Sequence, residues 1–401
     1  MKPWKQSLEN RYCRLLPPAG QPTDPDTYLE AIKMLGCAMV DNSGPVSEDR
    51  PEILMDSGYT YFGQFLDHDL TPDTSTLQEA WSKEPEEMEN LQTPRLDLKH
   101  LYGAGPFDGG SSHLYEDNDV RLKIGQPSAR GRSFDIAVEC GRPILADRRS
   151  MENLVLQQVT AVFARLHNFA VEQLRSTVSD PVELFERARL KTTWQFQWLV
   201  RGDYLQNVLD RKVYKMVFVD GKPVVEWDIE AGDSKTSAHR LVFSIPAEFS
   251  TAAMRFGHSM VRPNYLFSFE KDVSLEEIST RANRAESLED EWEIQWGFFF
   301  QGAGGVSPTT SRPIDTRIAP PLHHLPSEVI RLFSVPSRGL VGDPPQLAVR
   351  TLLRGAGLRL AFGRTVADAF GVARLSDDDL TRDDKGAVTP QGRILLDTEL
   401  V

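Results

Sequence analysis

The chain has 401 residues, 40% of them hydrophobic, and a formal net charge of −13. This apolar fraction can form a sizeable core, while the negative charge argues against nucleic acid and against an anionic membrane surface as partners. The three cysteines are too few and too widely spaced for a disulfide framework or a zinc site, and they fit a reducing compartment. The N-terminal residues lack the apolar segment of a signal peptide, and no run of about 18 apolar residues occurs. We therefore expect a cytoplasmic protein with no membrane partner.

Apolar residues at helical spacing are the main pattern of the chain, in which no internal repeat is visible. The pattern predicts a mainly α fold in a single domain, with an N-terminal arm (residues 1–50) packed on a body (51–401). A small β-hairpin with an Asp-Gly turn is predicted over residues 213–227. The helices are expected within residues 51–72, 150–174, 181–209, 249–261, 327–333 and 345–370.

The first of these helices carries an unusual set of polar residues. Gln64 and His68 are four residues apart, so a helix places them on one face. Asp67 and Asp69 lie about 100° to either side of that face at about 3.6 residues per turn. Phenylalanine and leucine surround the four polar residues in the sequence, which favours a buried pocket over a solvated surface. This helix is therefore predicted to present a base, an amide and two carboxylates.

Charged residues also cluster before the helix at 150–174. Asp147, Arg149 and Glu152 stand at its N-terminal end, and Arg165-Leu-His-Asn168 begins thirteen residues after Glu152. An acidic residue there is favourable for the helix dipole alone, so this motif by itself does not establish a site.

The helix at 249–261 contains Arg255-Phe-Gly-His258 and is expected to end before Pro263. A histidine that follows a glycine on an otherwise apolar helix leaves room for a flat ligand to come close. A lone histidine on an apolar helix is nevertheless more often a core residue than a ligand. The pattern therefore makes His258 a candidate ligand without identifying what it binds.

Taken in order, these motifs resemble those of the animal-type haem peroxidases, the peroxidase–cyclooxygenase superfamily. The string from Phe62 to Leu70 resembles the distal-histidine helix, the motif from Asp147 to Glu152 resembles the distal arginine segment, and Arg255 to His258 resembles the proximal segment. The chain looks like a bacterial, cysteine-poor member. The resemblance implies haem b, held between the helix of His68 and the helix of His258.

The resemblance also implies roles for the residues that face peroxide. His68 would be the acid–base catalyst, Arg149 would stabilise developing charge, and Gln64 would orient water or an anion. The implied function is an oxidoreductase that reduces hydrogen peroxide and oxidises a small donor, such as a halide, a phenol or a specialised metabolite, through a ferryl intermediate. A part in the response to oxidative stress is expected.

Other residues would hold the cofactor. His258 would ligate the iron, with Arg255 beside it. Thr351 stands where the family has an asparagine that accepts a hydrogen bond from the proximal imidazole. Asp67 and Glu152 match carboxylates that form ester bonds to haem methyl groups in some members, so a covalent link is expected through at least one of them.

The resemblance extends to a calcium loop, with Asp69, Thr93 and Asp97 as ligands. Lys99 stands where the family has a side-chain oxygen, and its ammonium group is expected to occupy the place of the ion if calcium is not bound.

Three other functions stay open. A fatty-acid dioxygenase of the cyclooxygenase branch needs a radical-forming tyrosine three residues before the proximal histidine, where this chain has Arg255. A non-haem metal site built from residues 67–69 is unfavourable because neighbouring side chains on a helix diverge. A haem-binding partner subunit without turnover is the third. Because bacterial relatives continue beyond the position of Val401, a partner chain or an oligomer is also expected.

Overall fold

The computed structural model describes residues 11–40, 55–72, 75–129, 131, 134–218, 244–325, 344–383 and 386–397. Helices dominate these residues and strands are few and short, so the prediction of a mainly α fold is confirmed. The strands form three separate two-stranded sheets, in which β1 pairs with β4, β2 with β3 and β5 with β6. None of the described helices is both long and apolar enough to cross a lipid bilayer.

The bounds of the helices and strands are as follows. The α-helices are α1 (Pro25–Ala38), α2 (Gly58–Leu70), α3 (Leu77–Ala80), α4 (Lys99–Tyr102), α5 (Leu154–Leu174), α6 (Pro181–Leu199), α7 (Leu205–Val208), α8 (Arg211–Phe218), α10 (Ala247–Thr251), α11 (Gly257–Met260), α12 (Leu275–Ala282), α13 (Pro320–His323), α15 (Leu347–Gly357), α16 (Gly363–Ala369), α17 (Asp377–Thr381) and α18 (Pro390–Asp397). The 3₁₀ turns used below are η5 (Arg148–Met151) and η8 (Ala253–Phe256), and η6 (Val200–Tyr204) is a π-helical turn. The strands are β1 (Tyr12–Cys13), β2 (Val138–Glu139), β3 (Arg142–Pro143), β4 (Ile245–Pro246), β5 (Asn264–Ser268) and β6 (Lys271–Ser274).

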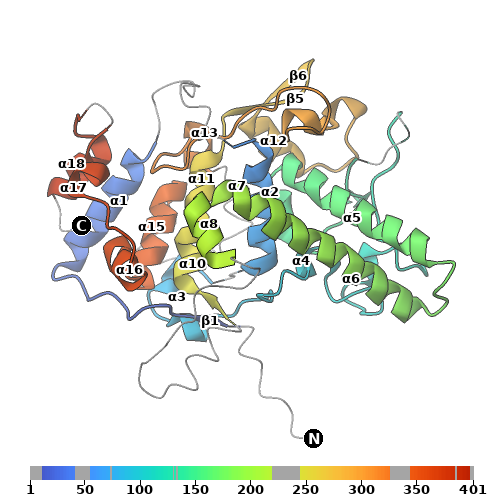
Figure 1. Cartoon of the computed structure of the whole chain (residues 1–401), viewed down its shortest axis with the longest axis horizontal. Helices are drawn as coiled ribbons and strands as arrows, with labels where there is room; N and C mark the ends of the chain where they lie inside the picture. The colour runs from blue at the N-terminus through green and yellow to red at the C-terminus, as the bar shows by residue number, and fades with distance from the viewer. Residues whose placement is uncertain are drawn as a thin grey trace, which may run out of the picture.

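Helix α2 lies in the middle of the molecule and is buried along almost its whole length (Figure 1). Phe65 stacks on Phe163 of α5, with ring centroids 4.7 Å apart, and meets Phe196 of α6 edge to face. Aromatic pairs of this kind stabilise a contact beyond the area that they bury. The polar residues of α2 are therefore held in a fixed orientation by the apolar residues between them.

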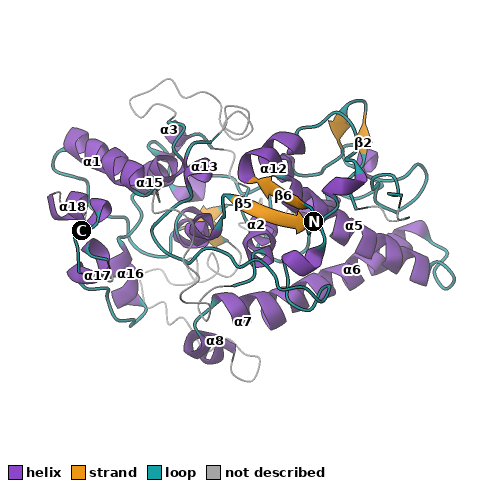
Figure 2. Cartoon of the chain, turned by 90° about the horizontal axis from the view of Figure 1, so that it is seen from above, coloured by secondary structure: helices purple, strands orange, loops and turns teal. Residues whose placement is uncertain are grey.

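Helices α5 and α6 form an antiparallel pair beside α2 (Figures 1 and 2). Each begins at a capping side chain, because Asn153 accepts a hydrogen bond from the amide of Leu156 and Asp180 accepts one from the amide of Val182. The helix predicted over 181–209 is confirmed, because residues 181–208 follow one helical path. The π-helical turn η6 separates α6 from α7.

The predicted helix over 249–261 is wrong as a single element. The chain forms α10, then η8, then α11, because Ala252 leaves the helical region with φ −120° and ψ −67°. The helical path ends at Val261, whose ψ of 130° is extended, two residues before Pro263. His258 therefore stands on one short turn rather than in the middle of a long helix.

The prediction of a β-hairpin over residues 213–227 is also wrong for the residues of that range that the structure describes. Residues 213–218 belong to the helix α8, and residues 219–227 lie outside the described part of the chain. A short apolar run fits a strand and a helix equally well, so the sequence pattern was ambiguous here. The predicted helix over 327–333 lies outside the described residues, and that over 345–370 is divided into α15 and α16.

Two N-terminal segments pack against the rest of the chain. Tyr12 and Cys13 pair in parallel with Ile245 and Pro246. Helix α1 lies beside α15 (Figure 1), and the contact is so close that a Cβ at Gly36 would come within 2.8 Å of the backbone of Val349. The glycine in the last turn of α1 is therefore explained by this approach of two helices.

Candidate active site

A cavity of about 660 Å³ lies next to α2, η5, α11 and α15. Its volume falls in the range of roughly 300–1,000 Å³ that is typical of ligand and cofactor sites. The sequence predictions for the peroxide and haem site all fall on its wall, although they come from distant parts of the chain. The lining includes Gln64, Asp67, His68, Arg149, Glu152, Arg255, His258 and Thr351.

His68 is almost fully buried on α2. Its Nδ1 atom has no hydrogen-bond partner within the described residues, and its Nε2 atom lies 4.0 Å from Glu152 Oε1. Burial, and then the positive charge of Arg149, hold the pKa of His68 well below its usual range. The imidazole is therefore neutral at neutral pH and can accept a proton.

Gln64 connects α2 to the beginning of α5. Its side-chain nitrogen donates to Glu152 Oε2, and its oxygen accepts a hydrogen bond of 2.9 Å from Asn153 Nδ2. Asn153 was not predicted for the site. Its residue type and its position before α5 indicate a helix cap, and its Oδ1 atom does accept a hydrogen bond from the amide of Leu156. Gln64 thus fixes Glu152 beside His68.

The environment of Glu152 favours the protonated form of its carboxyl group. Burial raises the pKa of its carboxyl group to about 8, against the opposing effect of the Arg149 charge. At neutral pH the protonated form of Glu152 is therefore favoured. Its Oε1 atom lies 4.0 Å from Nε2 of the neutral His68. This arrangement was not predicted from the sequence, which indicated only a charged residue at a helix end.

Arg149 is held from two sides. Its guanidinium group donates to the carboxylate of Asp147 at 2.6 Å and to the carbonyl oxygens of His68 and Thr71 at 2.8 and 2.7 Å. Although burial acts to raise the pKa of Asp147, the charge of Arg149 keeps it below its usual range. Arg149 satisfies two carbonyl groups at the C-terminal end of α2, which have no partner within the helix. It therefore positions the helix of His68 as well as lining the cavity.

An ion pair joins the two sides of the cavity. Asp67 accepts a hydrogen bond of 2.6 Å from Thr71 and lies 3.4 Å from Arg255 Nη1 on η8. The pair connects residues 188 positions apart in the sequence. Both oxygens of Asp67 are thus engaged by the protein.

His258 stands at the beginning of α11, and its ring forms no hydrogen bond within the described part of the chain. Burial lowers the pKa of His258 to about 3, with a smaller effect from Arg255, so the imidazole is neutral and has a lone pair for a metal. A Cβ at the neighbouring Gly257 would meet no atom within 4 Å. The open space beside Gly257 and the unpartnered Nδ1 atom of His68 together fit a flat iron cofactor held by His258.

Thr351 lines the same cavity from α15. Its hydroxyl group donates to the carbonyl oxygen of Leu347 at 3.0 Å, which leaves its oxygen lone pairs to accept a further hydrogen bond. Thr351 and His258 also both line a second cavity of about 530 Å³.

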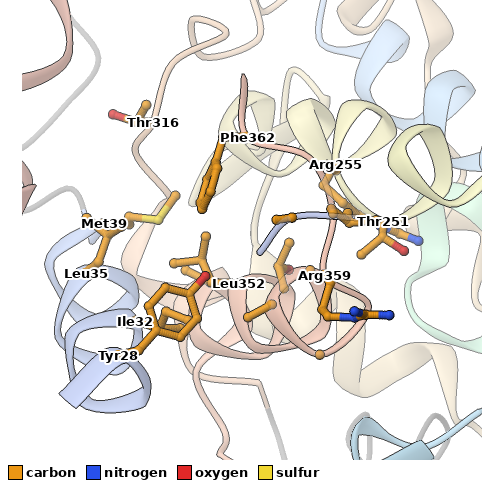
Figure 3. Close-up of a pocket in the computed structure, with 18 of the residues that line it drawn as sticks. Tyr28, Ile32, Leu35, Met39, Thr251, Arg255, Thr316, Leu352, Arg359 and Phe362 are labelled. Atoms are coloured by element: carbon orange, nitrogen blue, oxygen red, sulfur yellow. The ribbon is translucent and has the colours of Figure 1, made fainter. Parts of the chain in front are cut away.

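The second cavity lies between α1, α15 and the segment of His258 (Figure 3). Its wall is mostly apolar, and the close-up shows Arg255, Thr251 and Arg359 at one end of it. Arg359 lies 2.5 Å from Glu84 and is thus paired. The opposite end in the figure is formed by Tyr28, Ile32 and Leu35 of α1 and by Met39, which directly follows α1.

The predicted calcium ligands have other partners. Asp69 and His100 form a fully buried pair, with His100 Nδ1 2.9 Å from Asp69 Oδ1. Thr93 donates to Asp97 at 2.9 Å. The expectation that the ammonium of Lys99 takes the place of the ion does not hold, because Lys99 Nζ donates to the carbonyl oxygen of Leu91 at 2.6 Å. His100 was not predicted, and the sequence has no signal that links it to a carboxylate 31 residues away.

We expect the variant His100→Ala to melt at a lower temperature than the wild type. It leaves the buried carboxylate of Asp69 without a partner, which costs about 1–3 kcal/mol. Thermal melts followed by circular dichroism measure the change. Lys99→Ala is the matched control, since it removes only an exposed contact and should shift the melt little. A calcium chelator should leave the wild type unchanged. A large loss of stability on chelation would show instead that calcium is bound.

Residues 72–320, more than half of the chain, match the sequence model of the family described as animal haem peroxidase. Two curated relatives are similar to parts of the chain. A peroxidase-like protein of Margaritifera margaritifera is 24% identical over 258 residues, which cover 51% of this chain and 31% of that protein. The peroxidasin homolog pxn-2 of Caenorhabditis elegans is 25% identical over 194 residues, which cover 46% of this chain and 13% of that protein. The chain thus spans a third or less of the length of these relatives.

Solved structures of similar fold cover nearly the whole chain. Peroxidase A from Dictyostelium discoideum has a TM-score of 0.61 and 14% identity, covering 96% of this chain and 78% of that one. A fatty acid alpha-dioxygenase from Arabidopsis thaliana has a TM-score of 0.63 and 14% identity. The match covers 97% of this chain and 65% of that one. The matched family region contains Arg149 and His258, whereas His68 precedes it and Thr351 follows it.

Proposed function

Because the chain belongs to the animal haem peroxidase family, whose members are haem-dependent oxidoreductases, we propose that it reduces hydrogen peroxide and oxidises a small organic or halide donor. The observation that carries the proposal is the cavity of about 660 Å³ that His68 and His258 line from different elements. Burial keeps both imidazoles neutral. One neutral histidine can ligate iron while the other moves protons.

Three residues would hold the cofactor. His258 would ligate the iron, Thr351 would accept a hydrogen bond in its vicinity, and Arg255 would place a positive charge at the cofactor's edge. A bound haem would supply the electrons that reduce peroxide. Burial of the site keeps bulk water from the reacting atoms.

The remaining residues would manage the proton. His68 would take a proton from bound peroxide and return it to the departing water. A proton accepted at Nε2 would lie 4.0 Å from Glu152 Oε1. Gln64 holds Glu152 in that place, and one hydrogen of its amide is left to orient water or an anion. Arg149 would stabilise developing negative charge, and its charge also helps to keep His68 neutral.

We also propose a covalent link between the cofactor and a carboxyl group, and the contacts favour Glu152 over Asp67. A C–O bond to a haem methyl group would replace one of its C–H bonds, with hydrogen peroxide as the two-electron oxidant that is reduced to water. Both oxygens of Asp67 are engaged by Thr71 and Arg255. The side chain of Glu152 is 25% exposed and lies on the cavity wall. An ester with Glu152 would leave its hydrogen bond from Gln64 largely in place.

We place the protein in the cytoplasm, in the response to oxidative stress. Cys37 and Cys140 are exposed and none of the three cysteines forms a disulfide bond, which fits a reducing compartment.

A second candidate function is the oxygenation of a fatty acid. The second cavity of about 530 Å³ favours it, because an apolar chain would fit between α1 and α15 close to His258 (Figure 3). The similar fold of plant fatty acid alpha-dioxygenases agrees with this candidate. Arg255 argues against it, because its guanidinium is paired with Asp67 and cannot form the radical that a tyrosine at that position would form.

A single comparison separates the two functions. The holoprotein with hydrogen peroxide and a phenol should oxidise the phenol, as followed by absorbance. The same protein with a polyunsaturated fatty acid and a trace of peroxide should consume no oxygen in an oxygen electrode. Sustained oxygen uptake with hydroperoxide products would reverse this ranking. Absence of both reactions would leave the chain as a haem-binding partner subunit.

A further inference from the structure

Helix α6 presents a row of large apolar side chains to solvent. Leu190, Trp194 and Trp198 are 46%, 61% and 68% exposed. They are four residues apart, so they follow one stripe along the helix. Tryptophan is highly buried on average, so two neighbouring tryptophans that are more than half exposed mark a surface that contacts another body.

Helix α8 continues this surface. None of its residues is buried, and Val213 and Met216 are exposed among its basic residues. It is held against η6, the turn that follows α6, because Tyr214 donates to the carbonyl oxygen of Arg201 at 3.0 Å and Arg201 lies over the ring of Phe218. Helices α6, α7 and α8 follow one another along one edge of the molecule (Figure 2).

The charge of this edge is opposite to that of the whole chain. Residues 190–218 contain five basic residues and two aspartates, a net charge of +3, while the chain carries −13. Asp203 accepts a hydrogen bond from Tyr59, and Asp210 accepts one from the amide of Lys212 at the beginning of α8. The basic residues are Lys191, Arg201, Arg211, Lys212 and Lys215.

We propose that the α6–α8 face, made of Leu190, Trp194, Trp198, Val213, Met216 and these five basic residues, docks on an anionic lipid surface. Tryptophan side chains favour the boundary between water and lipid, and a helix with apolar and basic sides lies in that boundary. The basic residues would meet the negative head groups. Both features occur on the same edge, and together they point to a lipid surface.

Two other observations are consistent with a lipid partner. A symmetric pair of copies would bring the five basic residues of one copy against those of the other, which is unfavourable. The total charge of −13 does not prevent docking, because charges more than about 10 Å from the lipid are largely screened at 0.1 M salt. The proposal therefore replaces the expectation, drawn from the total charge, that the chain has no membrane partner.

Co-sedimentation of the full chain with vesicles tests the proposal. The protein should sediment with phosphatidylcholine vesicles that contain phosphatidylserine and not with phosphatidylcholine alone, and added salt should reduce the binding. The double variant Trp194→Ser, Trp198→Ser should bind at least about tenfold more weakly, and so should Arg211→Glu with Lys212→Glu. Phe269→Ser, which changes a 77% exposed aromatic residue elsewhere, should bind like the wild type.

Melting curves confirm that each variant is folded before binding is compared. Binding that is equal for both vesicle types, or that persists in the tryptophan variant, would overturn the proposal. Failure of the wild type to bind either vesicle would do so too. If the chain binds immobilised polyglutamate through the same tryptophans but no vesicle, the face belongs to an acidic protein partner instead.

Discussion

The variant His258→Ala is expected to lose the absorption spectrum of a histidine-ligated haem. The neutral imidazole of His258 is the proposed ligand from α11, and the space beside Gly257 is open to the cofactor. Cofactor that is not covalently linked should then be lost during purification. The measurement is the ratio of haem to protein absorbance, together with the position of the haem band.

A matched control is His113→Ala, because His113 is an exposed histidine in a 3₁₀ turn at Ser112–Leu114 that does not line the cavity. This variant should keep the wild-type spectrum. A covalent link through Glu152 or Asp67 adds a second readout. Haem would then stay on the polypeptide of His258→Ala after acid extraction, although the spectrum of histidine ligation is lost. An unchanged spectrum in His258→Ala would refute the assignment of the ligand.

The sequence allowed the residues of the cavity to be predicted, because helical spacing and three ordered motifs carry them. Gln64 and His68 lie on one helix face as their spacing requires, and both line the same cavity as His258. The sequence did not predict the break at Ala252, since apolar spacing alone does not show where a short helix ends. The mainly α fold was predicted from the helical spacing of apolar residues. This pattern extends over many residues, so one irregular position does not hide it.

The hydrogen-bond partners could not be read from the sequence. The contact of Arg149 with the carbonyl oxygens of α2 depends on how η5 packs beside that helix, and no pattern in the chain records it. The buried pair of Asp69 and His100 likewise joins two elements whose order in space is decided by packing. The total charge is likewise no guide to the α6–α8 face, because a sum over 401 residues does not show where the basic residues gather.

The variant His68→Ala is expected to react with hydrogen peroxide at least about a hundredfold more slowly than the wild type, the usual scale for a positioned acid–base group. Its haem content should stay close to normal, because His258 is unchanged. Stopped-flow absorbance after mixing with peroxide gives the rate. Gln64→Ala should slow the reaction much less, since Gln64 acts through Glu152 rather than on peroxide directly. A wild-type rate in His68→Ala would exclude the proposed role.

The pH dependence of that rate tests the same assignment by a different route. His68 must be neutral to accept a proton, and burial with the charge of Arg149 lowers its pKa well below the usual range. The rate should therefore stay level between about pH 6 and 7, where an ordinary imidazole with a pKa near 6.5 would begin to lose activity. Burial raises the pKa of the free Glu152 carboxyl to about 8, so in protein that has not formed the ester the rate should rise near that pH, as the carboxylate begins to stabilise a protonated His68. Glu152→Gln should remove the rise at pH 8 and leave the level region below it. A rise that persists in this variant would show that another group titrates there.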